Sequence, residues 1–165
     1  MAESPSIEEW PADHARWPEL LRVVETAQQA AWFASQMDWH RSSHVLVATK
    51  RTQIVGFLRF VIQMIGADDD HDPVMMHGTP LIEAKVLSFG VVPGYQRQGI
   101  GRALQSAALT LAKQRGCYQL RSHSSGTNSA NHQLKLSMGF GVHPIRRGDD
   151  NGGVYFVMPL QAIGE

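Results

Sequence analysis

The chain has 165 residues, of which 43% are hydrophobic and 18% charged, and its formal net charge is zero because 15 basic side chains match 15 acidic ones. This length predicts a single domain over residues 1–165 that buries about two-thirds of its unfolded surface. The balanced charge argues against a nucleic-acid partner, which usually needs a basic face, and it offers no attraction to an anionic membrane.

Three features of the sequence predict a cytoplasmic protein without a membrane partner. Cys117 is the only cysteine, so no internal disulfide can form and a reducing compartment is favoured. The N-terminal segment MAESPSIEEW is acidic and polar, unlike a signal peptide. The longest apolar stretch, residues 54–65, is interrupted by Arg59 and Gln63 and is too short to span a bilayer.

The first forty residues predict one helix and carry every tryptophan of the chain. Apolar residues recur at helical spacing, so an amphipathic helix is expected from Pro18 to about Gln36. For the tryptophans, packing in the core is favoured over an aromatic wall for a substrate. They are Trp10, Trp17, Trp32 and Trp39.

Three β-rich runs follow this helix. His44–Ala48 and Ile54–Ile65 are separated by a short polar stretch and predict an antiparallel hairpin. Ala67–Pro80 is expected to be a polar loop, and Leu81–Val92 a third strand.

The loop contains an acidic cluster that begins like a calcium-binding loop. Asp68, Asp70 and Asp72 match its first ligands, but Pro73 and Thr79 stand where a glycine and a glutamate are required. A solvated acidic loop is therefore favoured, with attraction of a cationic amine as the alternative. No metal is expected here or among the scattered histidines.

The second half of the chain alternates helices and strands. Apolar residues from Ile100 to Leu111 mark one helix face, and Gly116 ends this helix. A strand over 117–123, a short helix ended by Gly139 and a last strand over 154–160 complete the pattern, with a turn-rich stretch at 146–153. The order predicts an α/β or α+β protein with a mixed sheet, and it is too irregular for a doubly wound nucleotide fold.

A glycine-rich turn joins the third strand to the following helix at Val91–Arg102. The first N–H groups of a helix lack internal partners, so such a turn can hold an anion. A Walker loop is excluded because Ile100 and Gly101 stand where Lys and Ser or Thr are needed. A dinucleotide fingerprint is weak because Leu104 occupies the place of its third glycine.

Two segments support a third interpretation of the turn. Gln96–Gly101 has the pattern Gln-x-x-Gly-x-Gly after a strand ending in Val-x-Pro, and Asn128–Phe140 is a short helix ending in Gly-Phe. In this order, with a strand between them, they resemble the signature segments of the GNAT superfamily of acyl-CoA-dependent N-acyltransferases. The resemblance covers about residues 44–140. It implies a central mixed, mostly antiparallel sheet flanked by helices on both faces.

The resemblance also implies a binding site for acetyl-CoA as the acyl donor. The backbone of Phe89, Gly90 and Val91 would run beside the pantetheine arm like an extra strand, and Asn128 would bond the same region. The N–H groups of the turn would hold the pyrophosphate, with charge-assisted contacts from its two arginines. The residues of this turn are Gln96, Arg97, Gln98, Gly99, Ile100, Gly101 and Arg102.

The catalytic groups depart from the family pattern. Members commonly offer a Glu on the strand before the turn and a Tyr in the second helix, and here Lys85 and Lys135 stand at these positions. Glu83 shares a strand face with Lys85 and is the candidate general base. Lys135 is a candidate acid for the leaving thiolate, although a solvated lysine is favoured. Catalysis resting mainly on positioning is an alternative. Other candidate acids are Tyr95, His132 and Ser137.

We therefore expect an N-acetyltransferase that moves an acetyl group from acetyl-CoA to a primary amine of a small-molecule acceptor by direct attack. Residues 10–40, 66–80 and 143–153 are expected to form the acceptor pocket. One rival is a catalytically impaired regulatory module that binds acyl-CoA, and another is a nucleotide-binding protein of unrelated fold. Cys117 is expected to be a small buried group instead of a nucleophile. Homodimers are common among the proteins that this chain resembles, and no sequence feature decides the oligomeric state.

Overall fold

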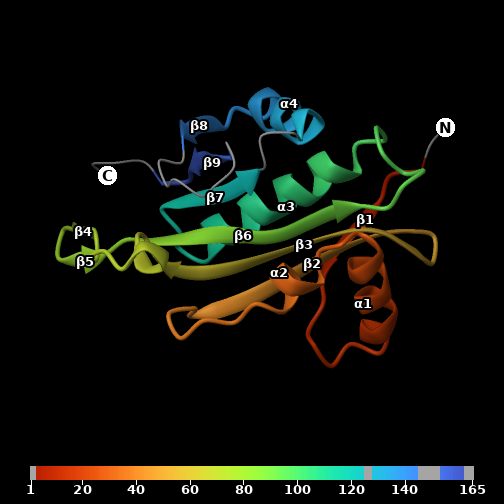
Figure 1. The fold of residues 1–165 in the computed structure, drawn as a ribbon, viewed down its shortest axis with the longest axis horizontal. Helices are drawn as coiled ribbons and strands as arrows, with labels where there is room; N and C mark the ends of the chain where they lie inside the picture. The colour runs from red at the N-terminus through yellow and green to blue at the C-terminus, as the bar shows by residue number, and fades with distance from the viewer. Residues whose placement is uncertain (1–2, 125–127, 145–152, 162–165) are drawn as a thin grey trace.

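The computed structural model describes residues 3–124, 128–144 and 153–161. A seven-stranded sheet in the order β1-β2-β3-β6-β7-β9-β8 forms the centre of the fold (Figure 1). Its strands are β1 (Ser6–Glu9), β2 (Ser42–Lys50), β3 (Gln53–Met64), β6 (Ile82–Val91), β7 (Gln119–Ser124), β8 (Gly141–Pro144) and β9 (Val154–Pro159). The remaining elements are α1 (Trp17–Thr26), α2 (Ala30–Ala34), the 3-10 helix η1 (Ala67–Asp69), the two-stranded hairpin of β4 (Met75–Met76) and β5 (Thr79–Pro80), α3 (Ile100–Gln114) and α4 (Ser129–Ser137).

Every neighbouring pair in the large sheet is antiparallel except β6 and β7, which run parallel. The helices α1 and α2 cover one face of the sheet, and α3 and α4 lie on the other (Figure 1). This arrangement confirms the mixed, mostly antiparallel sheet with helices on both faces. The expected hairpin of β2 and β3, the strands β6, β7 and β9, and the helices α3 and α4 are all present.

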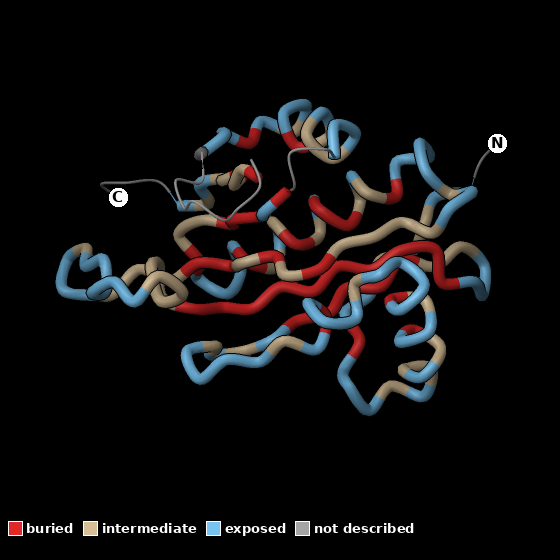
Figure 2. Tube along the Cα trace, in the orientation of Figure 1, coloured by how far each residue is buried: buried red, intermediate tan, exposed pale blue. Residues whose placement is uncertain are grey.

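Most residues of the central strands β2 and β3 are buried (Figure 2), and a core cluster lies on each face of the sheet. On one face, Leu104 and Ala108 of α3 belong to a core cluster with Leu58 and Phe60 of β3. On the other face, α1 and α2 contribute to a second cluster. Its fully or nearly buried members are Trp10, Leu20, Val24, Phe33, Val45, Val47, Ile54 and Phe57.

The helix expected from Pro18 to Gln36 is broken into α1 and α2, so this prediction is wrong in its extent. The break falls where Gln28 takes a left-handed φ of 59°. It turns α2 so that the Phe33 ring packs against the rings of Trp17 and Phe57, with centroid separations of 5.7 and 6.1 Å. A buried phenylalanine removes far more apolar surface from water than the exposed alanines of α2 would.

The sequence missed the shortest strands. Both β1 and β8 have four residues and lie at the sheet edges, and β4 and β5 have two each. Runs of this length are too short for an alternating pattern to be recognised. The turn-rich stretch expected at 146–153 lies, except for residue 153, outside the described residues.

The strand β6 departs from regular pairing at Leu87. Across the β3–β6 pair, Arg59 faces Ser88 and Phe60 faces Val86, so Leu87 is the extra residue of a β-bulge. The extra residue places Lys85 and Ser88 on the same sheet face, although they are three positions apart. In the described part of the chain, β6 pairs with β7 only as far as Val86 and Ser122 and then continues to Val91. The two strands therefore part in the middle of the sheet.

Candidate active site

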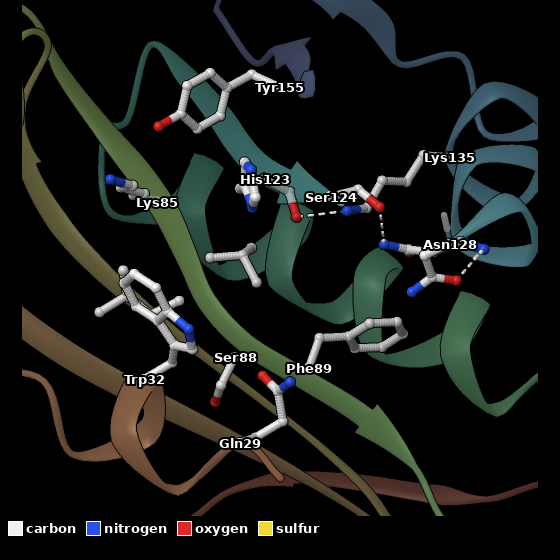
Figure 3. A pocket seen from close by; sticks show the side chains of 14 residues that line it. Gln29, Trp32, Lys85, Ser88, Phe89, His123, Ser124, Asn128, Lys135 and Tyr155 are labelled. Atoms are coloured by element: carbon white, nitrogen blue, oxygen red, sulfur yellow. Dashed lines mark hydrogen bonds between the residues drawn. The ribbon is translucent and has the colours of Figure 1, made fainter. Parts of the chain in front are cut away.

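A pocket of about 410 Å³ lies where β6 and β7 part. Its lining comes from both faces of the sheet, because the gap between the strands lets side chains from either side reach it. Figure 3 shows Trp32 and Lys85 on one side of the pocket, and Asn128 and Lys135 on the other. From the α1 and α2 face come Gln29, Trp32, Lys85, Ser88, His123 and Tyr155. From the α3 and α4 face come Phe89, Ser122, Ser124, Asn128, Asn131 and Lys135.

The helix α4 is joined to β7 by two side-chain hydrogen bonds at matching spacing. The Lys135 Nζ donates to the Ser122 hydroxyl at 2.6 Å, and the Asn131 Nδ2 donates to the Ser124 hydroxyl at 3.0 Å. Residues four apart on a helix and two apart on a strand both advance about 6–7 Å, so the two pairs match. These bonds fix one wall of the pocket.

Lys135 is the buried cation of this wall. Its side chain is 1% exposed, and its ammonium lies 5.3 Å from the centre of the Phe156 ring. Burial lowers the pKa of Lys135 to about 8, because a charged ammonium is poorly solvated there. A solvated lysine was favoured from the sequence, and this interpretation is wrong. The group is instead poised to hold or release a proton near neutral pH.

Asn128 begins α4 as its N-cap residue. Its side-chain oxygen accepts a hydrogen bond from the Asn131 backbone N–H at 3.2 Å. The Asn131 side-chain oxygen is buried and has no hydrogen-bond partner among the described residues. One polar atom at the pocket wall thus stays available to a ligand.

The glycine turn leads from β6 to α3 at one end of the gap. Gly94, Arg97 and Gly99 take left-handed φ angles of 93°, 62° and 81°. Within the described residues, the backbone N–H groups of 96–102 have no acceptor, and the first bond of α3 is donated by Ala103 to the Gly99 carbonyl. A Cβ added at Gly94 or Gly99 would meet nothing within 4 Å. The turn is therefore open, and its free donors suit an anion.

The comparisons with known proteins agree with this geometry. The family model described as "Acetyltransferase (GNAT) family" matches residues 6–140. The chain belongs to this family. No curated protein matches the sequence.

The fold of this GNAT acetyltransferase is shared with many solved structures. One is Arabidopsis thaliana NAA60 in complex with acetyl-CoA, with a TM-score of 0.70 and 16% identity over 95% of this chain and 100% of that one. Another is the ribosomal-protein-S18-alanine N-acetyltransferase from Escherichia coli, with a TM-score of 0.63 and 21% identity over 98% and 97% of the chains. A third is the IAA acetyltransferase from Bacillus cereus, with a TM-score of 0.62 and 16% identity over 95% and 100%. At these identities the likeness concerns the fold.

The predicted donor-binding residues of the GNAT domain lie along one path. Phe89 lines the pocket, and Gly90 and Val91 continue β6 toward the turn. A Cβ at Gly90 would come within 2.8 Å of the Phe57 ring, so packing requires glycine here. A Cβ at Gly101 would lie 3.2 Å from both Leu134 and Phe89. The absence of a side chain at this position therefore lets α3 and α4 pack close together. Their roles toward acetyl-CoA stay predictions.

The other residues of the turn differ in what their side chains can offer. Ile100 is buried in the core, so only its backbone can contact a ligand. Gln98 accepts a hydrogen bond from Lys50 at 2.7 Å, and Arg102 donates one to the Ser137 hydroxyl at 2.7 Å. Gln96 and Arg97 are exposed. The backbone N–H groups are therefore the only groups that all the predicted phosphate-binding residues of the turn share.

Glu83 lies outside this pocket. It is 0% exposed, and its two carboxylate oxygens accept bonds from Gln63, Gln119 and Arg121 at 2.8–3.1 Å. The group lines a different hollow, near β8. Its role as general base stays a prediction, and this geometry favours a structural ion pair. Of the other candidate acids, the Tyr95 hydroxyl donates to Gln53 at 2.8 Å, and neither Tyr95, His132 nor Ser137 lines the pocket.

Asp68 connects the acidic loop to the sheet. It accepts hydrogen bonds from both Lys85 and Arg121, and its side chain is 13% exposed. Burial alone would raise the pKa of Asp68, but the bond from Lys85 and the charges of Arg121 and Lys85 outweigh it and hold the pKa below its usual value. The prediction of a fully solvated acidic loop is therefore wrong for Asp68. Its carboxylate is committed to two cations of the sheet.

Cys117 is buried, as expected, and burial raises the pKa of its thiol to about 11. The thiolate that a nucleophile needs is therefore scarce at neutral pH. Within the described ranges, no group of three His, Cys, Asp or Glu side chains is arranged to hold a metal. None of the described helices is long and apolar enough to cross a membrane.

Sequence reasoning missed several pocket residues. Trp32 is 58% exposed and Trp39 40%, so the favoured core packing is wrong for both. Trp32 lines the pocket, and the alternative of an aromatic wall for a substrate stays a prediction. Ser122 and Ser124 carried no motif, but their alternation along β7 could have indicated a shared face opposite α4. Tyr155 stands on β9, opposite His123 of β7. Its place near Lys85 of β6 depends on a strand order that the sequence did not reveal.

Proposed function

We propose that the chain transfers an acetyl group from acetyl-CoA to a primary amine of a small-molecule acceptor, by direct attack of the amine on the thioester. One observation carries the proposal: the pocket lies where β6 and β7 part, and residues from both faces of the sheet line it. A donor entering from the α3 and α4 face and an acceptor entering from the other face would meet there. Direct transfer requires this kind of meeting point.

The donor side offers complementary groups along its length. The free N–H groups of residues 96–102 suit a pyrophosphate, and helix α3 adds its positive end. Beyond Val86, the edge of β6 that faces β7 can bond an extended amide-bearing arm as an added strand would. The unpartnered oxygen of Asn131 accepts a further bond. These groups are complementary to the hydrogen-bonding and charged groups of acetyl-CoA.

Lys135 is proposed as the general acid. In the transfer, the nitrogen lone pair forms the new C–N bond while the C–S bond breaks and its electrons stay on sulfur. A proton from Lys135 Nζ then neutralises the thiolate, and solvent restores the proton to the lysine. A pKa near 8 suits this role, because efficient acids titrate close to the working pH.

The amine is proposed to enter as the free base and to lose its extra proton to solvent after attack. Among the described residues no Asp or Glu lines the pocket, so positioning replaces a carboxylate base in this mechanism. Glu83 remains the alternative base. The single buried Cys117 and the balanced charge support a cytoplasmic location for the enzyme. A homodimer is compatible with the family resemblance and is part of the same proposal.

The test is a turnover screen with the full chain, acetyl-CoA and a panel of primary amines. Release of free CoA thiol and formation of the N-acetyl product, followed by mass spectrometry, would support the transferase. Calorimetry with CoA reports donor binding in the same samples. Tight CoA binding without turnover of any amine would favour the impaired regulatory module. Equal competition by ATP would instead indicate a nucleotide site.

A further inference from the structure

The pocket has an uneven charge, with Lys85 on the acceptor side and Lys135 on the donor side. Lys85 and Lys135 line the pocket, whereas no described carboxylate does. Asp68 and Glu83 lie outside the pocket lining and are matched one for one by Lys85 and Arg121 through three ion pairs. This cluster is neutral as a whole. The remaining buried cations of the region therefore decide its net charge.

Arg59 is the first of these cations. It is 4% exposed and donates to the Ser43 hydroxyl and to the carbonyls of Trp32 and Ser35, at 2.6–3.1 Å. All three partners are neutral, and no described carboxylate forms an ion pair with it. Arg59 faces Ser88 across the β3–β6 pair, which places it directly beside the pocket wall. Lys135, bonded to the neutral Ser122 hydroxyl, is the second such cation.

His40 lies near these charges. Burial lowers its pKa, the charges of Arg59 and Lys85 lower it further, and the charge of Asp68 opposes them. Ser88 is 2% exposed, lines the pocket, and its hydroxyl has no partner in the part of the chain that the structure describes, so it can donate a hydrogen bond to a ligand. The acceptor side thus combines the Lys85 ammonium and the neighbouring Arg59 with the free Ser88 donor, and this combination suits an anion.

Two aromatic rings frame the same region. Trp32 stands at the pocket lip on α2, and Tyr155 on β9 lies with its ring over Arg121 at 4.5 Å and near Lys85 at 5.9 Å (Figure 3). Both rings give apolar contact, and the two cations beneath Tyr155 are those of the neutral cluster, so the unpaired Arg59 supplies the positive charge of this side. A small acceptor would be held between them.

From this arrangement we propose that the acceptor is a primary amine that carries an anionic group, a carboxylate or phosphonate within a few bonds of the nitrogen, which Lys85 and Ser88 bind. This inference rests on the proposed acetyl transfer and names the substrate class of that site. The same positive charge favours the neutral form of the amine, since nearby cations lower the pKa of an ammonium group. It therefore supplies the free nucleophile without a carboxylate base. A polycationic amine would be repelled.

The test uses amines in matched pairs that differ in the anion alone. The pairs are 4-(aminomethyl)benzoate with 4-(aminomethyl)benzamide, β-alanine with β-alaninamide, and 3-aminopropylphosphonate with 3-aminopropanol, and 1,3-diaminopropane is the cationic member. We expect the anionic member of a pair to have a kcat/KM roughly tenfold above its neutral partner, with the difference shrinking as salt is raised. A preference for neutral or cationic members would overturn the inference. The carboxylate and phosphonate arms show which anion is preferred.

Variants at one ion pair separate recognition from structural effects. Lys85→Met should remove most of the anionic preference, Lys85→Arg should restore part of it, and Asp68→Asn should increase it. Lys113→Met, an exposed lysine at the end of α3, is the control and should change nothing. A merely structural role of Lys85 would lower turnover of both members of a pair equally. Equal loss would therefore contradict the proposed contact.

Calorimetry keeps this inference separable from the proposed function. The wild-type protein is saturated with CoA, and the anionic and neutral members of each pair are titrated into it. If neutral amines alone are acetylated, the transferase stands and the anionic class is wrong. If no amine is acetylated, the transferase proposal fails, and the calorimetric titration still tests whether the site prefers anionic amines. Tighter binding of the anionic members supports it, and equal binding overturns it.

Discussion

The Lys135 ammonium on α4 donates a 2.6 Å hydrogen bond to the Ser122 hydroxyl on β7, and both side chains are buried while lining the pocket. The bond ties the second signature helix to the strand that parts from β6. It also holds a cation whose pKa is lowered to about 8 by burial. Lys135 thus has a fixed position in the pocket wall, a charge and a lowered pKa, and it occupies the position where the family usually has a tyrosine.

Substitution of Lys135 should change the pH dependence of kcat. If its ammonium form donates the proton, kcat falls as pH rises through about 8 in the wild type. Lys135→Gln should lower kcat by about 10²-fold or more and remove that limb, since general acids contribute about 10²–10⁴-fold. Lys135→Arg keeps the charge but does not titrate below pH 12. A descending limb that persists in Lys135→Gln would assign the acid to another group.

Glu83→Gln separates the structural role of this carboxylate from the predicted role as base. The change leaves the buried Arg121 with Asp68 as its one remaining carboxylate, and breaking a buried pair costs about 3–5 kcal/mol. We expect a large fall in unfolding free energy, measured in denaturant, and a nearly unchanged kcat per folded molecule. The opposite outcome, normal stability with a strongly reduced kcat and an altered pH–rate profile, would restore Glu83 as the base. Exposed Glu25→Gln on α1 is the matched control.

The glycine turn can be tested by shortening the donor. S-acetylpantetheine lacks the pyrophosphate, so its kcat/KM should lie about 10²-fold or more below that of acetyl-CoA if the N–H groups of residues 96–102 bind phosphate. Gly101→Val should weaken acetyl-CoA binding and narrow this difference. Because a Cβ at Gly101 also meets Leu134 and Phe89, the pantetheine donor reports the part of the loss that is due to packing. Equal use of both donors by the wild type would remove the phosphate role from the turn.

The sequence predicted the fold because its long elements carry strong local signals. The hairpin of β2 and β3, the helix α3 with its stop at Gly116, and both family segments lie in continuous runs whose periodicity or glycine spacing is visible without tertiary contacts. The break at Gln28 could not be recognised in the sequence, because it is stabilised by the packing of Phe33 between two aromatic rings that are distant along the chain. Long-range packing decided that element.

The site was predictable only in its backbone part. The turn at 96–102 follows from local spacing, whereas the pocket depends on the parting of β6 and β7 and on the bulge at Leu87. Both arise from strand pairing between segments that are far apart in the sequence. The burial of Lys135 and the pairing of Asp68 with Lys85 are further products of that assembly, so neither could be inferred from residue type.

The pairing of Asp68 should give the protein an acid-sensitive part of its stability. The folded pKa of Asp68 lies below the unfolded value of about 4, so its contribution is complete above that pH and is lost as pH falls through the lower folded value. Asp68→Asn should therefore lower the unfolding free energy by roughly 1–3 kcal/mol at pH 7 and by clearly less near pH 3. Chemical denaturation at both pH values measures the difference. Asp70→Asn, an exposed residue of the same loop, should match the wild type at both. A pH-independent difference between Asp68→Asn and the wild type would show that the loop depends on the shape of this side chain and not on its charge.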